Sequence, residues 1–333
     1  MWPRTDLNRT GGAWLRQISL GGGLPNPSMF PITGAKFTLS DGSEMVLDDE
    51  SMTDAFQYSA TPGLPKLIDW LGKLQTHVHH PPLPQELLIS TGSQDVLSMA
   101  FEMLIDRGDH VLVESPTYSG SLSALHPLGC TLVGLQTDDH GLLPSSLQTT
   151  LDSWPADKSK PKVLYIIPNG CNPTGGSLSR ERRAQIYAIA RRHDIIILED
   201  DAYYFVQFGA TKAPSFLSMD EDGRVLRFDS FSKIISSGLR LGFATGPQPL
   251  IYHLNLHAQA SYLHTSGLSQ TVLLNLLQRW GIEGFIGHTD KVSAFYLQRR
   301  DVFQAALEKH LTGLAEWSPP SAGNVMNLNK PLV

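Results

Sequence analysis

Short apolar runs that alternate with longer helical patterns constrain the fold of this chain more than any other feature. The runs occupy residues 87–90, 111–113, 131–133, 163–167, 195–198 and 225–228. Helical patterns at 96–104 and 180–192 lie between them. Strands that alternate with helices pair in parallel through crossover connections, so the sequence predicts an α/β fold with a mostly parallel central sheet. In such sheets, ligands collect where strands end and helices begin.

Composition narrows the class of protein. The chain has 333 residues, of which 41% are hydrophobic and 17% charged, which is typical of a globular protein with a large core. A net charge of -6 disfavours nucleic acid and anionic membranes as partners, and no apolar run reaches the roughly 18 residues of a membrane span. We expect no metal site. Two cysteines indicate a reducing compartment, so we expect a cytoplasmic protein, with a mitochondrial one as the alternative.

The segment 230–242 carries the most specific chemistry. The amine of Lys233 can condense with a carbonyl to form a Schiff base. Ser230 and Ser232 offer hydroxyl donors to a phosphate, and Arg240 can bind phosphate oxygens with two parallel hydrogen bonds. A solvated Ser/Lys/Arg loop is the alternative, but the spacing favours a site for a phosphorylated aldehyde, pyridoxal 5'-phosphate.

An acidic stretch follows the apolar run that ends at Leu198. A carboxylate beneath a pyridine nitrogen keeps that nitrogen protonated and makes the ring an electron sink, and Asp201 fits this role. Tyr204, three residues later, can lend its hydroxyl to the phenolic oxygen of the ring. The alternative is an acidic helix N-terminus with tyrosines packed in the core.

Three further strand ends carry polar or aromatic residues. Asn172 precedes Pro173 in a sharp turn, where a cis bond can aim the side-chain amide. Residues 91–94 pass from a strand into a helix whose N-terminus can bind phosphate, although Ser93 also fits a simple helix cap. Tyr118 can stack on a ring or pack as an ordinary core residue.

Together, these motifs resemble those of the fold-type I, class I/II aminotransferases, which depend on pyridoxal 5'-phosphate. The chain is most similar to the kynurenine/alpha-aminoadipate aminotransferase subgroup, through segments 22–27, 125–129 and 232–240. The resemblance extends from about residue 4 to residue 323. It implies a large cofactor-binding domain and a smaller second domain.

The resemblance also implies residue roles. Lys233 is the catalytic residue that holds the cofactor and moves the substrate's α proton. The cofactor-binding residues are Ser93, Gln94, Tyr118, Asn172, Asp201, Tyr204, Ser230, Ser232, Lys233 and Arg240, with Tyr58 reaching the site of a neighbouring subunit in a homodimer. Gly23, Asn172 and Arg4 are implied on the substrate side.

The resemblance ends before the family pattern is complete. Family members continue into residues that finish the small domain and supply an arginine for the substrate's α-carboxylate, whereas the last arginine here is Arg300. We therefore expect a C-terminally truncated member whose activity is impaired. The predicted division is an N-terminal arm at 1–30, a large pyridoxal-phosphate domain at 31–255, and a connecting helix near 256–280 with a truncated small domain up to 333.

Three functions are compatible with these residues. The first is transfer of an amino group from an aromatic amino acid, kynurenine or 2-aminoadipate to a 2-oxoacid such as 2-oxoglutarate. The second is a pyridoxal-phosphate-dependent C–S or β-lyase, because elimination also begins with loss of the α proton. The third is a catalytically dead remnant that binds the cofactor.

Overall fold

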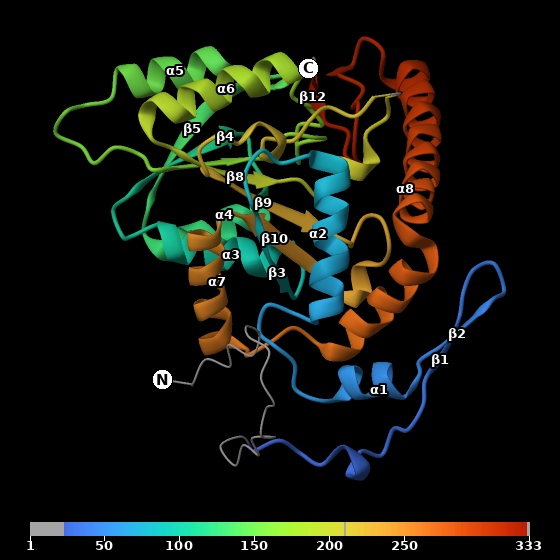
Figure 1. Ribbon diagram of the computed structural model, residues 1–333. Helices are drawn as coiled ribbons and strands as arrows, with labels where there is room; N and C mark the ends of the chain where they lie inside the picture. The colour runs from blue at the N-terminus through green and yellow to red at the C-terminus, as the bar shows by residue number, and fades with distance from the viewer. Residues whose placement is uncertain (1–22, 210, 332–333) are drawn as a thin grey trace.

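The computed structural model describes residues 23–209 and 211–331, which are built around a central eight-stranded sheet (Figure 1). The strand order is β3-β10-β9-β8-β7-β4-β5-β6. The strands are β3 (Glu86–Ser90), β4 (His110–Ser115), β5 (Thr131–Asp138), β6 (Gly141–Leu142), β7 (Val163–Ile166), β8 (Ile196–Asp200), β9 (Val225–Ser230) and β10 (Gly242–Gly246). The five strands from β9 to β5 are mutually parallel, β10 is antiparallel to both of its neighbours, and β6 is antiparallel to β5. The predicted α/β fold with a mostly parallel sheet is confirmed.

Helices cover both faces of the sheet because its strands are apolar on both sides. The helices are α1 (Asp49–Phe56), α2 (Pro65–His79), α3 (Ser93–Leu104), α4 (Ser119–Leu125), α5 (Pro144–Asp152), α6 (Arg180–His193), α7 (Gln248–Ser261) and α8 (Gly267–Leu311). Figure 1 shows α5 and α6 on one face and α3, α4 and α7 on the other. A further cluster joins α2 and α8 to the end of the sheet that contains β3 and β10.

Successive strand residues alternate between two cores, and this alternation decides which side chains face the site. On β8, Ile197 packs with the α5 and α6 residues, whereas Leu198 packs with those of α3, α4 and α7. On β9, Val225 and Leu226 divide in the same way. Whether a residue occupies an odd or an even position along its strand therefore determines which face of the sheet its side chain lies on.

The region after the sheet differs from the single helix predicted at 256–280. Helix α7 ends at Ser261, α8 begins at Gly267, and α8 continues to Leu311 through a kink at Gly281, whose φ is 63°. Helix α7 also crosses the predicted domain boundary at residue 255. Two small antiparallel pairs lie outside the main sheet: β1 (Lys36–Thr38) with β2 (Glu44–Val46), and β11 (Ala315–Trp317) with β12 (Leu328–Pro331).

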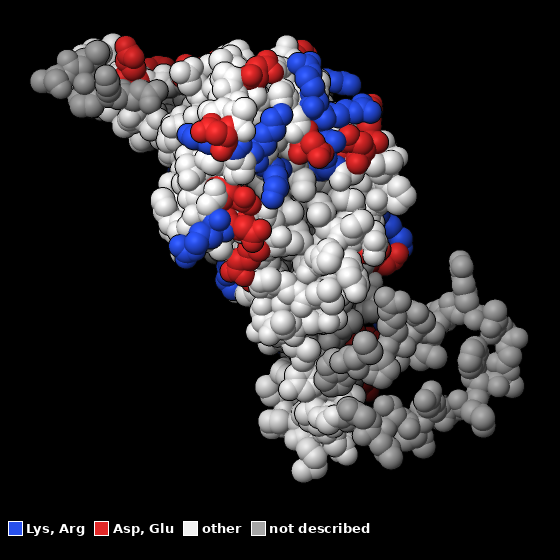
Figure 2. Space-filling model, turned by 90° about the vertical axis from the view of Figure 1, so that its left-hand side faces the viewer, with Lys and Arg blue, Asp and Glu red and all other residues white. Residues whose placement is uncertain are grey.

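Charged side chains of both signs are interspersed on the face shown in Figure 2, and they concentrate in its upper part. The lower part of that face is largely uncharged. Across residues 23–209 and 211–331, no helix combines the length and apolarity needed to cross a bilayer. The same residues contain no cluster of three or more His, Cys, Asp or Glu side chains placed to bind a metal ion.

Candidate active site

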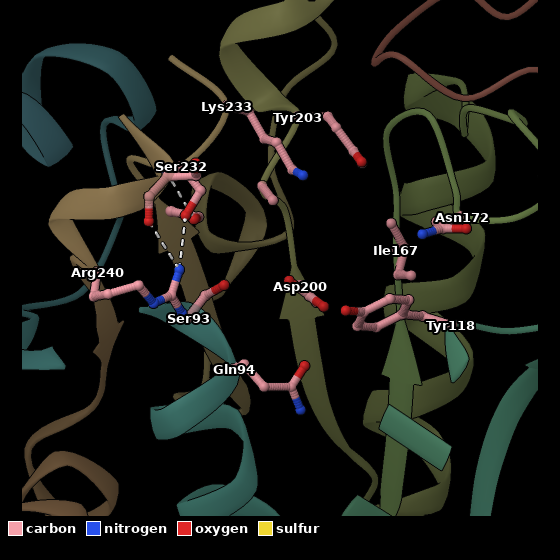
Figure 3. Close-up of a pocket in the computed structure, with 13 residues that line it drawn as sticks. Ser93, Gln94, Tyr118, Ile167, Asn172, Asp200, Tyr203, Ser232, Lys233 and Arg240 are labelled. Carbon is pink, nitrogen blue, oxygen red and sulfur yellow. Dashed lines mark hydrogen bonds between the residues drawn. The ribbon is translucent and has the colours of Figure 1, made fainter. Parts of the chain in front are cut away.

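A cavity of about 240 Å³ lies where β4, β7, β8 and β9 end (Figure 3). Its lining residues are Ser93, Gln94, Tyr118, Ile167, Asn172, Asp200, Ala202, Tyr203, Ser230, Ser232, Lys233, Ser237 and Arg240. Eight residues predicted for the cofactor site are among them: Ser93, Gln94, Tyr118, Asn172, Ser230, Ser232, Lys233 and Arg240. The structure thus brings together residues that lie up to 147 positions apart in the chain (240 − 93).

One end of the cavity is rich in hydrogen-bond donors. Helix α3 begins there at Ser93, after Gly92 with φ 85°, and its N-terminal amides carry partial positive charge. Arg240 donates to the carbonyl of Ser237 at 3.2 Å and to the Ser232 hydroxyl at 3.5 Å. Its Nη2 atom also donates to the Thr91 carbonyl at 3.4 Å. A guanidinium has five N–H donors, so Arg240 retains donor capacity for an anion.

Lys233 lies between the two ends of the cavity. Figure 3 shows its amine directed into the open space, with Arg240 to one side and Asn172 and Tyr118 to the other. The Lys233 Nζ atom is 5.9 Å from the centre of the Tyr203 ring. Lys233 is half-buried, and the buried side chains of Phe231 and Ile234 hold its chain segment in the core.

The other end of the cavity is acidic. Asp200 is the last residue of β8, and its Oδ2 atom accepts a hydrogen bond from the Tyr165 hydroxyl at 2.8 Å. Burial raises the pKa of Asp200 to about 6, while the Tyr165 hydrogen bond opposes the shift. Burial also raises the pKa of Tyr203 to about 12, with the Asp200 charge as the next cause. Tyr203 therefore keeps its proton at neutral pH and can donate a hydrogen bond.

The prediction that Asp201 faces this cavity is wrong in its placement. Asp201 points to the opposite face of the sheet, where it accepts hydrogen bonds from Arg227 at 2.9 Å and from Asn169 at 2.9 Å. The physical reason is the length of β8, which extends two residues beyond Leu198. Side chains alternate along this extension, so Asp200 rather than Asp201 shares the Leu198 face.

Tyr204 is displaced from the cavity for a related reason. Its ring packs 4.6 Å from the His79 ring and 5.0 Å from the Arg227 guanidinium, in the cluster that α2 and α8 cover. Tyr203 lines the cavity in its place. Asp200 could have been found by continuing the period-2 pattern of the strand past Leu198, because that pattern places Asp200 on the site face. Tyr203 could not have been found in this way, because it lies beyond the end of β8.

The turn after β7 supplies Asn172. The Asn172–Pro173 bond is cis, and the turn is closed by hydrogen bonds between Cys171 and Gly176 and between Gly175 and Cys171. Figure 3 shows the Asn172 side chain at the edge of the cavity near Tyr118. This placement agrees with the interpretation of the turn as a device that aims an amide into the site.

The remaining predicted site residues lie elsewhere. Tyr58 is exposed and does not line the cavity, and its ring stands edge-on to His264 at 5.8 Å. Gly23 is exposed and also lies outside the lining. Arg4 lies outside the described residues.

The cavity fits a pyridine ring with a phosphate arm. Donors for a dianion occupy one end, a carboxylate that can pair with a protonated ring nitrogen occupies the other, and an amine lies between them. Backbone approaches closely at the donor end, since a Cβ on Gly242 would lie 2.4 Å from the Ser93 backbone nitrogen. This fold and this set of side chains define a class of enzyme that holds its cofactor through a lysine.

Comparison with known proteins identifies the family. Residues 34–331 match the family model for aminotransferase class I and II, and the chain belongs to this family. It is 48% identical over 320 residues to the mitochondrial kynurenine/alpha-aminoadipate aminotransferase of Bos taurus, covering 92% of this chain and 75% of the relative. It is 39% identical to the aminotransferase tdiD of Emericella nidulans, covering 92% and 73% of the two chains.

Solved structures agree with this assignment. The aminotransferase Aro8 from Candida albicans superimposes with a TM-score of 0.87 at 30% identity, covering 92% of this chain and 74% of that one. A kynurenine aminotransferase of Pyrococcus horikoshii, in complex with PMP and with KYN and KYA, gives a TM-score of 0.78 at 27% identity, covering 91% and 73%. The chain is an aminotransferase of the pyridoxal-phosphate-dependent class.

Proposed function

We propose that the cavity binds pyridoxal 5'-phosphate, with Lys233 as its anchor. Ser93, Gln94, Ser230, Ser232 and Arg240 would hold the phosphate. The observation that carries the proposal is that one cavity holds the Lys233 amine, the Asp200 carboxylate and this donor set. When bound, the cofactor supplies an electron sink that stabilises negative charge at the substrate's α carbon.

The residues at the acidic end would hold the ring. Asp200 would pair with the ring nitrogen, and Asn172 and Tyr203 would donate to the ring oxygen, which replaces the roles first expected of Asp201 and Tyr204. Tyr118 would pack against the face of the ring. Each of these side chains lies at the end of a strand or in the turn after one, where the sheet limits its movement.

Lys233 has a second task in the proposed reaction. Its Nζ atom, once neutral, would take the proton from the substrate's α carbon and return a proton later in the reaction. The side chain is half-buried, and its amine is directed into the cavity. Transfer of an amino group to a 2-oxoacid requires both proton steps, whereas an elimination requires only the first.

For the substrates, we propose aromatic amino acids, kynurenine or 2-aminoadipate as amino donors, and a 2-oxoacid such as 2-oxoglutarate as acceptor. The support is the naming of the relatives, which include kynurenine/alpha-aminoadipate and aromatic amino acid aminotransferases. Gly23 and Asn172 are proposed on the substrate side. The lyase and the inactive remnant are less well supported, because these relatives are aminotransferases.

We also propose a homodimer in which Tyr58 contributes to the partner's cavity. Tyr58 is 58% exposed, although it is a large aromatic residue. Other exposed apolar side chains come from the N-terminal segment and from α7, α8 and the loop between them: Leu24, Met29, Ile32, Tyr252, Leu256, Leu263 and Leu268. Exposed apolar residues in such numbers are typical of an interface. Sedimentation of the wild type and of Tyr58→Ala tests this proposal.

The domain division and the compartment remain proposals. We propose that residues 31–255 form the cofactor domain, because every residue of the cavity lies between 93 and 240. Residues 256–333 would form the second unit with α8. The free thiols of Cys130 and Cys171 suit a reducing compartment, and we propose the cytoplasm. Three relatives are named as mitochondrial, and fractionation of cells decides between the two.

The decisive experiment follows the absorbance of the purified protein after loading with pyridoxal 5'-phosphate. We expect a bound-cofactor spectrum that bleaches with kynurenine, 2-aminoadipate or an aromatic amino acid and returns with 2-oxoglutarate. Lys233→Ala should abolish both the spectrum of the anchored cofactor and turnover. Release of ammonia with an oxoacid and no recovery would indicate a lyase, and a spectrum indifferent to every amino acid would indicate a remnant.

A further inference from the structure

Tyr165 is a fully buried residue of β7 with a polar contact to the cavity. Its ring packs in the core beneath the site, edge-on to Phe101 at 5.6 Å. Its hydroxyl donates to Asp200 Oδ2 at 2.8 Å. Burial raises the pKa of Tyr165 well above its ordinary value, and the Asp200 charge raises it further, so this phenol keeps its proton and remains a donor.

Strand register explains how the hydroxyl reaches Asp200. Tyr165 pairs with Leu198 across β7 and β8, and Leu198 shares a face with Asp200, two residues further on. The phenol therefore approaches Asp200 from the floor of the cavity. Oδ2 is anchored in this way, while Oδ1 receives no hydrogen bond from residues 23–209 or 211–331.

We propose that Tyr165 is a positioning residue for the transamination reaction: its hydroxyl fixes the Asp200 carboxylate so that the second oxygen, ionised, meets the ring nitrogen of the cofactor. This inference rests on the proposed cofactor site. It assigns to a core tyrosine, outside the lining of the cavity, a part in the electron-sink chemistry.

The surroundings of Asp200 show why such a donor is needed. The nearby carboxylates of Asp201 and Asp229 disfavour ionisation of Asp200, and burial disfavours it more strongly. Two groups favour ionisation, and the Tyr165 hydrogen bond acts more strongly than the Arg227 charge. Without the hydroxyl, the carboxylate would lose its fixed orientation together with the larger of these two contributions.

The test compares Tyr165→Phe with a matched control, Tyr187→Phe. Tyr187 is also a buried tyrosine whose hydroxyl donates to carboxylates, those of Asp220 and Asp222, but it does not line the cavity. The two probes are pyridoxal 5'-phosphate and its analogue with a C–H group in place of the ring nitrogen. Dissociation constants are measured on the full-length apoprotein, and thermal unfolding is recorded in parallel.

We expect Tyr165→Phe to weaken binding of pyridoxal 5'-phosphate by up to about 10-fold, because the hydrogen bond is already present without the cofactor and its loss acts by lowering the fraction of Asp200 that is ionised and oriented for binding. Binding of the analogue should stay within about twofold, since it makes no bond to Asp200. When the affinity for the cofactor is plotted against pH, the loss of affinity on the acidic side should also move to higher pH in Tyr165→Phe. The groups that act on Asp200 in this titration are Tyr165 through its hydrogen bond, and Asp201, Asp229 and Arg227 through their charges from the opposite face of the sheet. Lys233 and Tyr203 face it from within the cavity.

Two results would overturn the inference: unchanged affinity for pyridoxal 5'-phosphate, or an equal loss for both probes, which would mean that the hydroxyl only supports packing. A second arm repeats the substitution in an Asp200→Ala background, where removal of the hydroxyl should have no further effect on affinity. Full additivity of the two losses would also refute it. Failure of the wild type to bind the cofactor would instead refute the proposed function.

Discussion

Replacing Gly92 with alanine tests the geometry of the phosphate end directly. The added Cβ would lie 2.4 Å from Arg240 Nη2 and 3.1 Å from Arg240 Cζ. Ordinary contact begins near 3.4 Å, so the guanidinium must retreat by about 1 Å (3.4 − 2.4). The φ of Gly92 is 85°, which side chains with a Cβ rarely adopt, so the backbone adds a cost of about 1–3 kcal/mol.

These two effects predict different observables. The backbone cost lowers the free energy of unfolding and therefore the Tm of the apoprotein. The displaced guanidinium would lose its proposed contact with the phosphate, worth about 1.5–3 kcal/mol, so the Kd for pyridoxal 5'-phosphate should rise roughly 10- to 100-fold. Fluorescence titration of the apoprotein measures the Kd, and calorimetry measures the Tm.

Gly108→Ala is the matched control for this substitution. Gly108 has a φ of 86°, but a Cβ at that position meets nothing within 4 Å. This variant should lose stability to a similar extent while keeping the Kd of the wild type. A Gly92→Ala protein that binds the cofactor as tightly as the wild type would refute the assignment of Arg240 to the phosphate.

Four further substitutions test buried charged groups in and near the site. Asp200→Asn should lower kcat/KM about 100-fold or more with little change in Tm, because the charge acts on the reaction. Asp201→Asn should instead lower the Tm and leave kcat nearly intact. Steady-state kinetics with the opposite pattern would contradict the placement of the two residues. Arg227→Met should cost about 3–5 kcal/mol in urea unfolding, because it leaves three carboxylates buried without their cation, and a loss below about 1 kcal/mol would contradict this. Burial raises the pKa of Glu114 to about 7, although hydrogen bonds from a backbone amide and the Cys171 thiol oppose the shift. The native state therefore binds the proton more tightly than the unfolded state. Glu114 consequently lowers the free energy of unfolding more and more as the pH rises from about 4.5 to 7. Glu114→Gln should therefore raise the stability of the apoprotein relative to wild type more at pH 8 than at pH 5, and an equal difference at both pH values in urea unfolding would contradict the shift.

Much of the fold could be predicted because buried parallel strands are continuous apolar runs. All six predicted strands lie in the central sheet within two residues at their N-terminal ends. Strand β10 lies in the interior of the sheet but was not predicted, because its sequence Gly-Phe-Ala-Thr-Gly has weak strand propensity. It forms a strand because β9 and β3 hydrogen-bond to it on both sides.

The site was predictable where a residue's role depends on its own turn or helix start. Ser93 at the start of α3, Asn172 in its cis-proline turn and Arg240 after Lys233 all lie in the cavity as expected. Asp201 and Tyr204 were misplaced because their faces depend on how far β8 continues. That length is set by pairing with β9, in which Asp200 lies opposite Phe228.

Local chemistry, then, is enough to specify a parallel α/β sheet, a lysine amine among phosphate donors, and the turns that carry polar side chains, since each of these depends on residues a few positions apart. Pairing between β7, β8 and β9 decides which of two adjacent aspartates faces the cavity. The same pairing decides whether the Tyr165 hydroxyl reaches Asp200. A strand shows its side chains alternately to opposite faces, so a shift of one residue in strand length or register exchanges a site residue for a core residue. That choice is made only when distant segments of the chain come together.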